Sequence, residues 1–146
     1  MSRLTADDVA CWVLKTTRPP DEIAPRWRPG TAQELTRCVR PSYRLHLMAA
    51  GQPCALWLSG RDRPGVHGLG SLEGPVEDDE GGPAVPVRLT LLPDPVLRAD
   101  LLGDPRMQDA EVLRIPAGSN PSWLSRAQFD AVLDRAPEVC LPRWGA

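Results

Sequence analysis

Residues 51–72, GQPCALWLSGRDRPGVHGLGSL, decide the fold of this chain. The apolar run 54–58 has the length of a strand, residues 60–65 are rich in turn formers, and residues 66–72 alternate apolar side chains with glycine. This pattern predicts a β-hairpin. Glycines inside a strand often mark a bulge, a barrel corner, or a place where a ligand or a neighbouring backbone comes close. A tightly curved barrel strand without any ligand explains them equally well.

Shorter elements are predicted on both sides of this hairpin. The apolar run 9–14 predicts a buried first strand, and residues 84–92 predict a later strand in which Pro86 marks an edge or a bulge. Ser125 and Gln128 have the spacing of a capping box for a final helix. The other predicted elements are helices at 31–39, 43–50 and 125–133, helical turns at 96–102, an acidic loop at 77–83 and a last strand at 111–115.

Together these elements predict an α+β fold in which short helices flank a curved mixed sheet or barrel. A chain of 146 residues is expected to form a single domain over residues 1–146, with a core at about 9–135 and a loosely held tail at 137–146. The sequence has no run of about 18 apolar residues and no signal-peptide core. We therefore expect a cytoplasmic protein that does not span a membrane.

The chain is nearly neutral, with a formal net charge of −2, so it is not expected to cover many nucleic-acid phosphates. Arginine is concentrated in the first half, which permits a local basic face. The arginines concerned are Arg26, Arg28, Arg37, Arg40, Arg44, Arg61 and Arg63. The cysteines form no CxxC pair and have no histidine at ligand spacing, so we expect no metal and no cofactor. Cys11 and Cys54 lie in apolar runs and are expected to be buried.

Motifs for catalysis and for phosphate binding are missing from the sequence. It contains no GxSxG elbow for nucleophilic catalysis, and His46 and His67 are isolated. Residues 65–70, GVHGLG, lack the glycine spacing of a dinucleotide-binding loop and precede no predicted helix. The carboxylates of residues 78–80 lie in the predicted acidic loop, where a solvated role is expected.

Tryptophans on strands and beside turns are the remaining candidates for a site. Trp12 lies on the first strand, Trp57 precedes the turn that begins at Ser59, and Trp123 lies in the predicted loop before the final helix. Several such rings around one cavity would stack on a planar base, while Ser59 and Asn120 would bind its polar edge. A single tryptophan is more often a core residue, so the prediction depends on their combination with the glycine-rich hairpin.

The order of motifs resembles the EVE domain of the PUA-like superfamily. The matching stretches are WVL at 12–14, GQPCALWLSG at 51–60, GVHGLG at 65–70, VPVRL at 85–89 and NPSWLS at 120–125. The resemblance spans about 9–133 and implies a PUA-like mixed β-barrel with short flanking helices. It also implies a pocket for a modified base in DNA or RNA, drawn from Trp12, Trp57, Ser59, Gly60, Asn120 and Trp123. Gln52 departs from the pattern, since EVE proteins commonly have an acidic residue there.

Two functions from different classes follow from this resemblance. The first is a non-catalytic module that binds DNA or RNA and reads a modified nucleobase, with Arg61 and Arg63 contacting the backbone. The second is a hydrolase of modified nucleosides similar to the ASCH relatives, in which Lys15, Thr16 or Thr17, and Glu73 would supply the lysine, threonine and carboxylate. A domain that only binds other proteins is a third interpretation.

Overall fold

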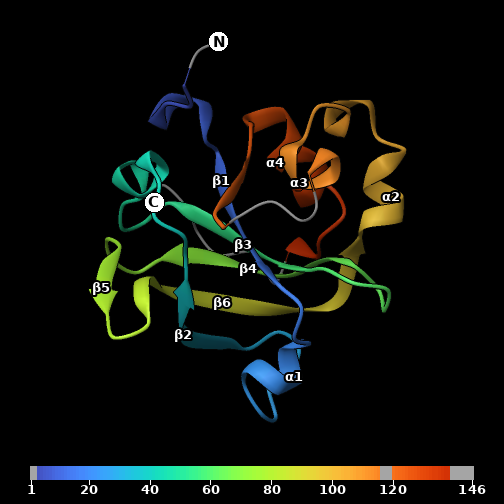
Figure 1. The fold of residues 1–146 in the computed structure, drawn as a ribbon. Coiled ribbons are helices and arrows are strands. Elements are labelled where there is room, and N and C mark those ends of the chain that lie inside the picture. Colours follow the sequence, from blue (N-terminus) through green and yellow to red (C-terminus); the bar gives the residue numbers. More distant parts are fainter. Residues whose placement is uncertain (1–2, 116–119, 139–146) are drawn as a thin grey trace.

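The computed structural model describes residues 3–115 and 120–138, and these form an α+β fold around one mixed sheet (Figure 1). Its seven strands follow the order β2-β6-β4-β3-β1-β7, with β5 paired to β6. The strands are β1 (Cys11–Thr16), β2 (Ala32–Cys38), β3 (Pro53–Leu58), β4 (Gly65–Leu72), β5 (Glu77–Asp79), β6 (Gly82–Leu97) and β7 (Ser122–Leu124). The helices are α1 (Pro20–Ile23), α2 (Arg98–Leu102), α3 (Glu111–Arg114) and α4 (Arg126–Leu133), with 3-10 turns η1 (Ala6–Asp8), η2 (Tyr43–Leu47) and η3 (Pro105–Met107). The expected α+β class is confirmed.

The predicted hairpin is confirmed as the antiparallel pair β3 and β4. Two of its glycines are explained by the neighbouring strand β6, because a Cβ at Gly65 or Gly70 would overlap the backbone of β6. At Gly70 the overlapping atom would be the Arg88 carbonyl oxygen. The close approach read from the sequence is therefore that of a neighbouring backbone.

The parallel pairing of β1 with β3 divides the core between the two faces of the sheet. Trp12 lies opposite Cys54, and these residues belong to a core cluster closed by β2 and β6. Val13 and Ala55, one residue further along each strand, belong to the second cluster. Side chains of α2, η3, α3 and α4 complete this second cluster, since these elements cover that face (Figure 1).

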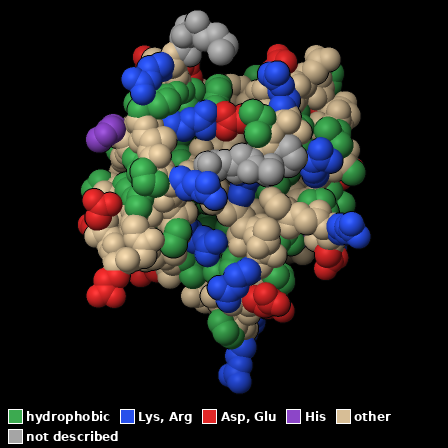
Figure 2. All heavy atoms as spheres, in the orientation of Figure 1, with side chains coloured by type: hydrophobic (Ala, Val, Ile, Leu, Met, Phe, Trp, Pro, Cys, Tyr) green, Lys and Arg blue, Asp and Glu red, His purple; other side chains and the backbone are tan. Residues whose placement is uncertain are grey.

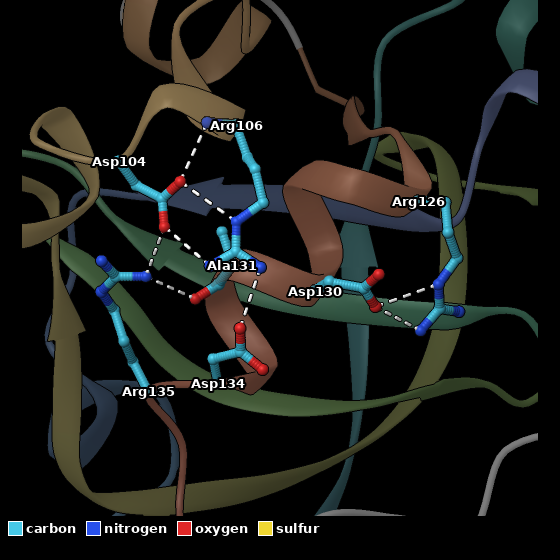
Figure 3. Close-up of polar contacts among 7 residues, drawn as sticks. All are labelled: Asp104, Arg106, Arg126, Asp130, Ala131, Asp134 and Arg135. Carbon is cyan, nitrogen blue, oxygen red and sulfur yellow. Dashed lines mark hydrogen bonds and ion pairs between the residues drawn. The ribbon is translucent and has the colours of Figure 1, made fainter.

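An ion-pair network holds α4 against η3 (Figure 3). The buried Asp104 carboxylate accepts hydrogen bonds from Arg106 Nε and Nη2 at 3.1 and 2.8 Å and from Arg135 Nη1 at 2.9 Å. Arg135 Nη1 also donates to the Ala131 carbonyl, and Arg106 Nη1 donates to Asp134. These contacts lower the pKa of Asp104, with the Arg106 hydrogen bonds contributing most. The network therefore joins residues that precede α3 in the sequence to residues that follow α4.

Two predicted elements are wrong. Residues 31–39 contain the strand β2 where a helix was expected, because β6 offers it a seven-position antiparallel ladder. Residues 111–115 contain the helix α3 where a strand was expected, and its Val112 packs into the core cluster beneath the helices. In both cases a non-local partner decided the structure of a short segment with weak intrinsic preference.

Smaller differences concern the ends of the sheet. Within residues 43–50 only Tyr43–Leu47 is helical, as the 3-10 turn η2, and the acidic loop contains β5. Pro86 lies in an interior strand, not at an edge. The missing N–H of Pro86 would point toward β4, beyond Leu72 and Val87, the last pair of the β4–β6 ladder. No ladder hydrogen bond is lost there, and the Pro86 carbonyl still accepts a hydrogen bond from Glu73 N. The capping box of Ser125 and Gln128 and the helix α4 are confirmed.

No helix in the described residues is long and apolar enough to cross a membrane. Within residues 3–115 and 120–138, no three His, Cys, Asp or Glu side chains gather in a metal-binding arrangement. Cys140 and most of the tail predicted at 137–146 lie outside the described residues.

Candidate functional site

The two outer strands of the sheet, β2 and β7, approach each other at Asn120. The β1–β7 ladder pairs Val13 with Ser122, and its continuation places Lys15 opposite Asn120. There the Asn120 side chain makes the two hydrogen bonds that the backbone of a partner strand would otherwise make. Its Oδ1 accepts from Lys15 N at 2.6 Å, and its Nδ2 donates to Lys15 O at 2.9 Å. From the other side, Arg40 N beyond β2 donates to Asn120 O at 3.0 Å. Within the described residues β2 and β7 form no ladder, so the barrel is left incomplete at this point.

A partly buried ion pair lies next to this junction. Arg44 of η2 donates from Nη1 and Nη2 to the two carboxylate oxygens of Glu111 on α3, at 2.8 and 2.7 Å. Ser122 Oγ donates to Glu111 Oε1 at 2.9 Å, and Arg44 Nη1 also donates to the Pro121 carbonyl. The Arg44 hydrogen bonds lower the pKa of Glu111 against the opposing effect of burial, and they raise the pKa of Arg44. The pair is therefore charged at neutral pH and fixed in geometry.

Two open hollows flank this ion pair. One has a volume of about 280 Å³ and is lined by Ser42, Ile115, Asn120 and Pro121 as well as the pair itself. The other has a volume of about 350 Å³ and brings the half-buried rings of Tyr43 and Trp123 to the same ion pair. A fixed charge pair with an aromatic ring beside it suits a small planar polar ligand.

Positive side chains extend from these hollows across one face of the molecule. Lys15 is partly buried, its Nζ lies 3.4 Å from the Ile115 carbonyl, and burial lowers its pKa while Glu111 opposes that shift. Burial also lowers the pKa of Arg37 on β2, and neighbouring Arg18 lowers it further. Figure 2 shows Lys and Arg side chains in a band through the middle of this face, with acidic side chains mostly toward its edges.

The predicted cage of Trp12 and Trp57 is not assembled. Trp12 is 0% exposed and Trp57 is 2% exposed, and their rings lie in the two different core clusters. Trp12 Nε1 donates to Gln52 Oε1 at 2.8 Å, while Gln52 Nε2 donates to the Leu47 carbonyl. The amide of Gln52 suits both contacts, because its oxygen accepts a hydrogen bond from β1 and its nitrogen donates one to η2.

The other predicted site residues lie at the surface or near it. Ser59 is half-buried and Gly60 exposed in the β3–β4 turn, which Ser59 N joins to the end of β1 through the Thr16 carbonyl at 2.8 Å. Arg61 and Arg63 are exposed in the same turn. The remaining two, Asn120 and Trp123, border the hollows beside the ion pair, with Trp123 on the strand β7 and not in a loop.

The residue set of the hydrolase alternative is not brought together. The Thr16 side chain is buried, and its Oγ1 accepts from Arg18 N. Lys15 lies opposite Trp57, which pairs with Val66, whereas Glu73 follows the other end of β4. Seven residues of strand at about 3.3 Å each separate Val66 from Glu73, or about 23 Å. The carboxylate close enough to act on Lys15 is instead that of Glu111.

Sequence reasoning missed Glu111, Ser122 and Tyr43. Glu111 was placed in a predicted strand, and its partner Arg44 lies 67 positions away. Arg44 belongs to the arginine-rich first half of the sequence, which permits a local basic face. The signal that could have singled out Glu111 is its place as an acidic residue in the first turn of a helix, had the helix α3 been recognised.

No family model matches the sequence, and no curated protein matches it. Solved structures do match the fold. A hypothetical protein from Leishmania major has a TM-score of 0.65 at 17% identity, covering 89% of this chain and 96% of its own. The DUF55 domain of human thymocyte nuclear protein 1 has a TM-score of 0.58 at 16% identity, covering 86% and 97%.

The same human protein, THYN1, also matches in a complex with DNA that contains 5-methylcytosine. That structure has a TM-score of 0.53 at 16% identity and covers 86% of this chain and 96% of its own. Because DUF55 is an EVE domain, the expected EVE and PUA-like architecture is confirmed at the level of the fold. Within the described residues, the mixed sheet of this chain is curved but not closed.

Proposed function

We propose that this chain is a non-catalytic nucleic-acid-binding module that reads a modified base in the hollows beside Arg44 and Glu111. The observation that carries the proposal is the position of this fixed ion pair, where a half-buried tryptophan ring meets a band of positive charge. The fold shared with a human protein bound to DNA containing 5-methylcytosine supports it.

The chemistry of the hollows suits a base that has left its stack. Trp123 supplies a stacking face, which is worth about 1 to 3 kcal/mol per base. The Glu111 carboxylate offers acceptor oxygens and the Arg44 guanidinium offers N–H donors in the hollow that Trp123 borders, so a polar base edge there meets both kinds of group. This proposal keeps Trp123 from the predicted pocket and leaves out Trp12 and Trp57, which are buried on opposite faces of the sheet.

The test is a titration of labelled oligonucleotides with and without 5-methylcytosine. We expect tighter binding of the modified strand, and we expect Trp123→Ala to weaken binding of that strand by about 5- to 150-fold if it removes one stacking contact. Leu102→Ala is the control, because Leu102 is an exposed apolar side chain on α2. Equal affinity of the wild-type protein for modified and plain strands would overturn the proposal.

A further inference from the structure

Lys15 and Arg37 are partly buried cations that form no ion pair within the part of the chain that the structure describes. Arg18 is a second positive group near Arg37, whereas Lys15 has both Glu111 and Arg44 nearby, and the effect of Glu111 is the larger of the two. Desolvated like charges cost free energy, and a bound anion would recover it. Arg106 and Arg135, in contrast, are neutralised by carboxylates. The partly buried charge of Arg37, and to a smaller degree that of Lys15, therefore points to an anionic ligand.

These cations lie on the two sides of the gap where the barrel is incomplete. Lys15 lies near the end of β1 and Arg18 follows that strand, while Arg37 lies near the end of β2 and Arg40 follows it. Asn120 joins the two sides, because its side chain bonds the Lys15 backbone and its carbonyl accepts from Arg40 N. We call these four residues the cation row.

The length of the cation row favours a polymer over a single small anion. Arg37 and Arg40 are three residues apart, a span of up to about 10 Å of chain. Guanidinium groups bind phosphate oxygens in a bidentate way, and consecutive phosphates of one strand would meet successive members of the row.

We propose that the cation row holds the sugar–phosphate backbone of the nucleic-acid strand whose base enters the hollow beside Glu111. This rests on the proposed function and adds the path of the strand, which crosses the gap between β1 and β2. The exposed β3–β4 turn, where Arg61 and Arg63 were predicted from sequence to contact the backbone, lies on the β3 side of the β1 end. The two sets of arginines therefore predict different paths.

The test compares R18Q/R37Q with R61Q/R63Q, which remove the same charge from the two places. Affinity for an oligonucleotide containing 5-methylcytosine, and for its plain counterpart, is measured over a series of KCl concentrations. Each lost phosphate contact changes the slope of log K against log salt by about 0.7 to 0.9. We expect R18Q/R37Q to make the slope shallower by about 1.4 to 1.8 for both oligonucleotides. R61Q/R63Q should change it by less than half as much.

An unchanged slope in R18Q/R37Q, or equal changes in both variants, would overturn the proposal. If the row instead bound a free anion, inorganic phosphate would raise the Tm of the wild type but not of R18Q/R37Q, with no change in slope. Failure of the proposed function is a separate result, because it removes the preference for the modified strand whatever the slope. Should R18Q/R37Q not fold, R18Q/R40Q tests the same path, because both of these arginines are exposed.

Discussion

Asn120→Ala tests whether this asparagine completes the sheet or reads a ligand. The Asn120 amide occupies the position where the β1–β7 ladder would place its next pair, and it satisfies both Lys15 N and Lys15 O. Alanine removes both bonds and leaves the backbone of β1 without a partner on that side. The variant should therefore lose stability, and the Lys15 ammonium should lose its fixed position.

The expected loss follows from the two bonds and their exposure. A hydrogen bond contributes about 0.5 to 1.5 kcal/mol, and an unsatisfied buried group costs about 1 to 3 kcal/mol. Lys15 is only partly buried, so water can replace part of the lost partner. We expect a total of about 1 to 3 kcal/mol. At about 3 °C per kcal/mol for a chain of this size, Tm should fall by about 3 to 9 °C.

Urea denaturation and calorimetry measure this loss. Asn120→Asp is the matched variant, because it keeps an acceptor for Lys15 N but places a carboxylate oxygen against Lys15 O. It should also be less stable than the wild type. A change of less than about 0.5 kcal/mol in Asn120→Ala, the size typical of a surface substitution, would refute the structural role. Full stability with lost base preference would favour the base-reading role that the sequence suggested.

Three further predictions concern packing, charge and cysteine exposure. Gly70→Ala should prevent folding or destabilise strongly, as measured by soluble yield and Tm, because its Cβ would overlap the Arg88 carbonyl. Glu111→Gln should destabilise at neutral pH by about 1 to 2 kcal/mol. Because the folded-state pKa of Glu111 is lowered, this difference should persist above the unfolded pKa of about 4.3 and vanish as the pH falls through the folded value. Cys38 is exposed and should react first with a thiol reagent.

Each of these has an internal control. Gly60→Ala is the control for Gly70, because Gly60 has a positive φ but open space around it, so only backbone strain of about 1 to 3 kcal/mol is added. A pH-independent difference between the wild type and Glu111→Gln would contradict the ion-pair explanation. Labelling is done in a Cys140→Ser background, and Cys11 and Cys54 should resist it, because burial raises their pKa values.

Local patterns predicted those elements whose structure depends on neighbours in sequence. The hairpin was read from an apolar run, a turn and glycines, and α4 from the capping box of Ser125 and Gln128. The β2 strand and α3 were missed because each is short and depends on a distant partner, β6 for one and Arg44 for the other. Propensity alone does not determine the structure of such segments.

The aromatic cage could not be tested from sequence because it depends on strand register. Side chains alternate between the faces of a sheet, and opposite residues on adjacent strands share a face. Lys15 lies opposite Trp57, and Trp12 is an odd number of residues from Lys15, so the two tryptophans must face opposite sides. A shift of one residue between β1 and β3 would have put both rings on one face.

The hairpin that decides the fold positions the candidate site without forming it. Glycine at position 70 lets β4 approach β6 more closely than a side chain would allow. The far edge of β6 carries β2, and the chain beyond β2 returns to Asn120, where Arg40 donates its backbone hydrogen bond. If β4 and β6 were held further apart, the end of β2 would lie further from the end of β1. The close approach that Gly70 permits between β4 and β6 therefore helps to bring the end of β2 near the end of β1.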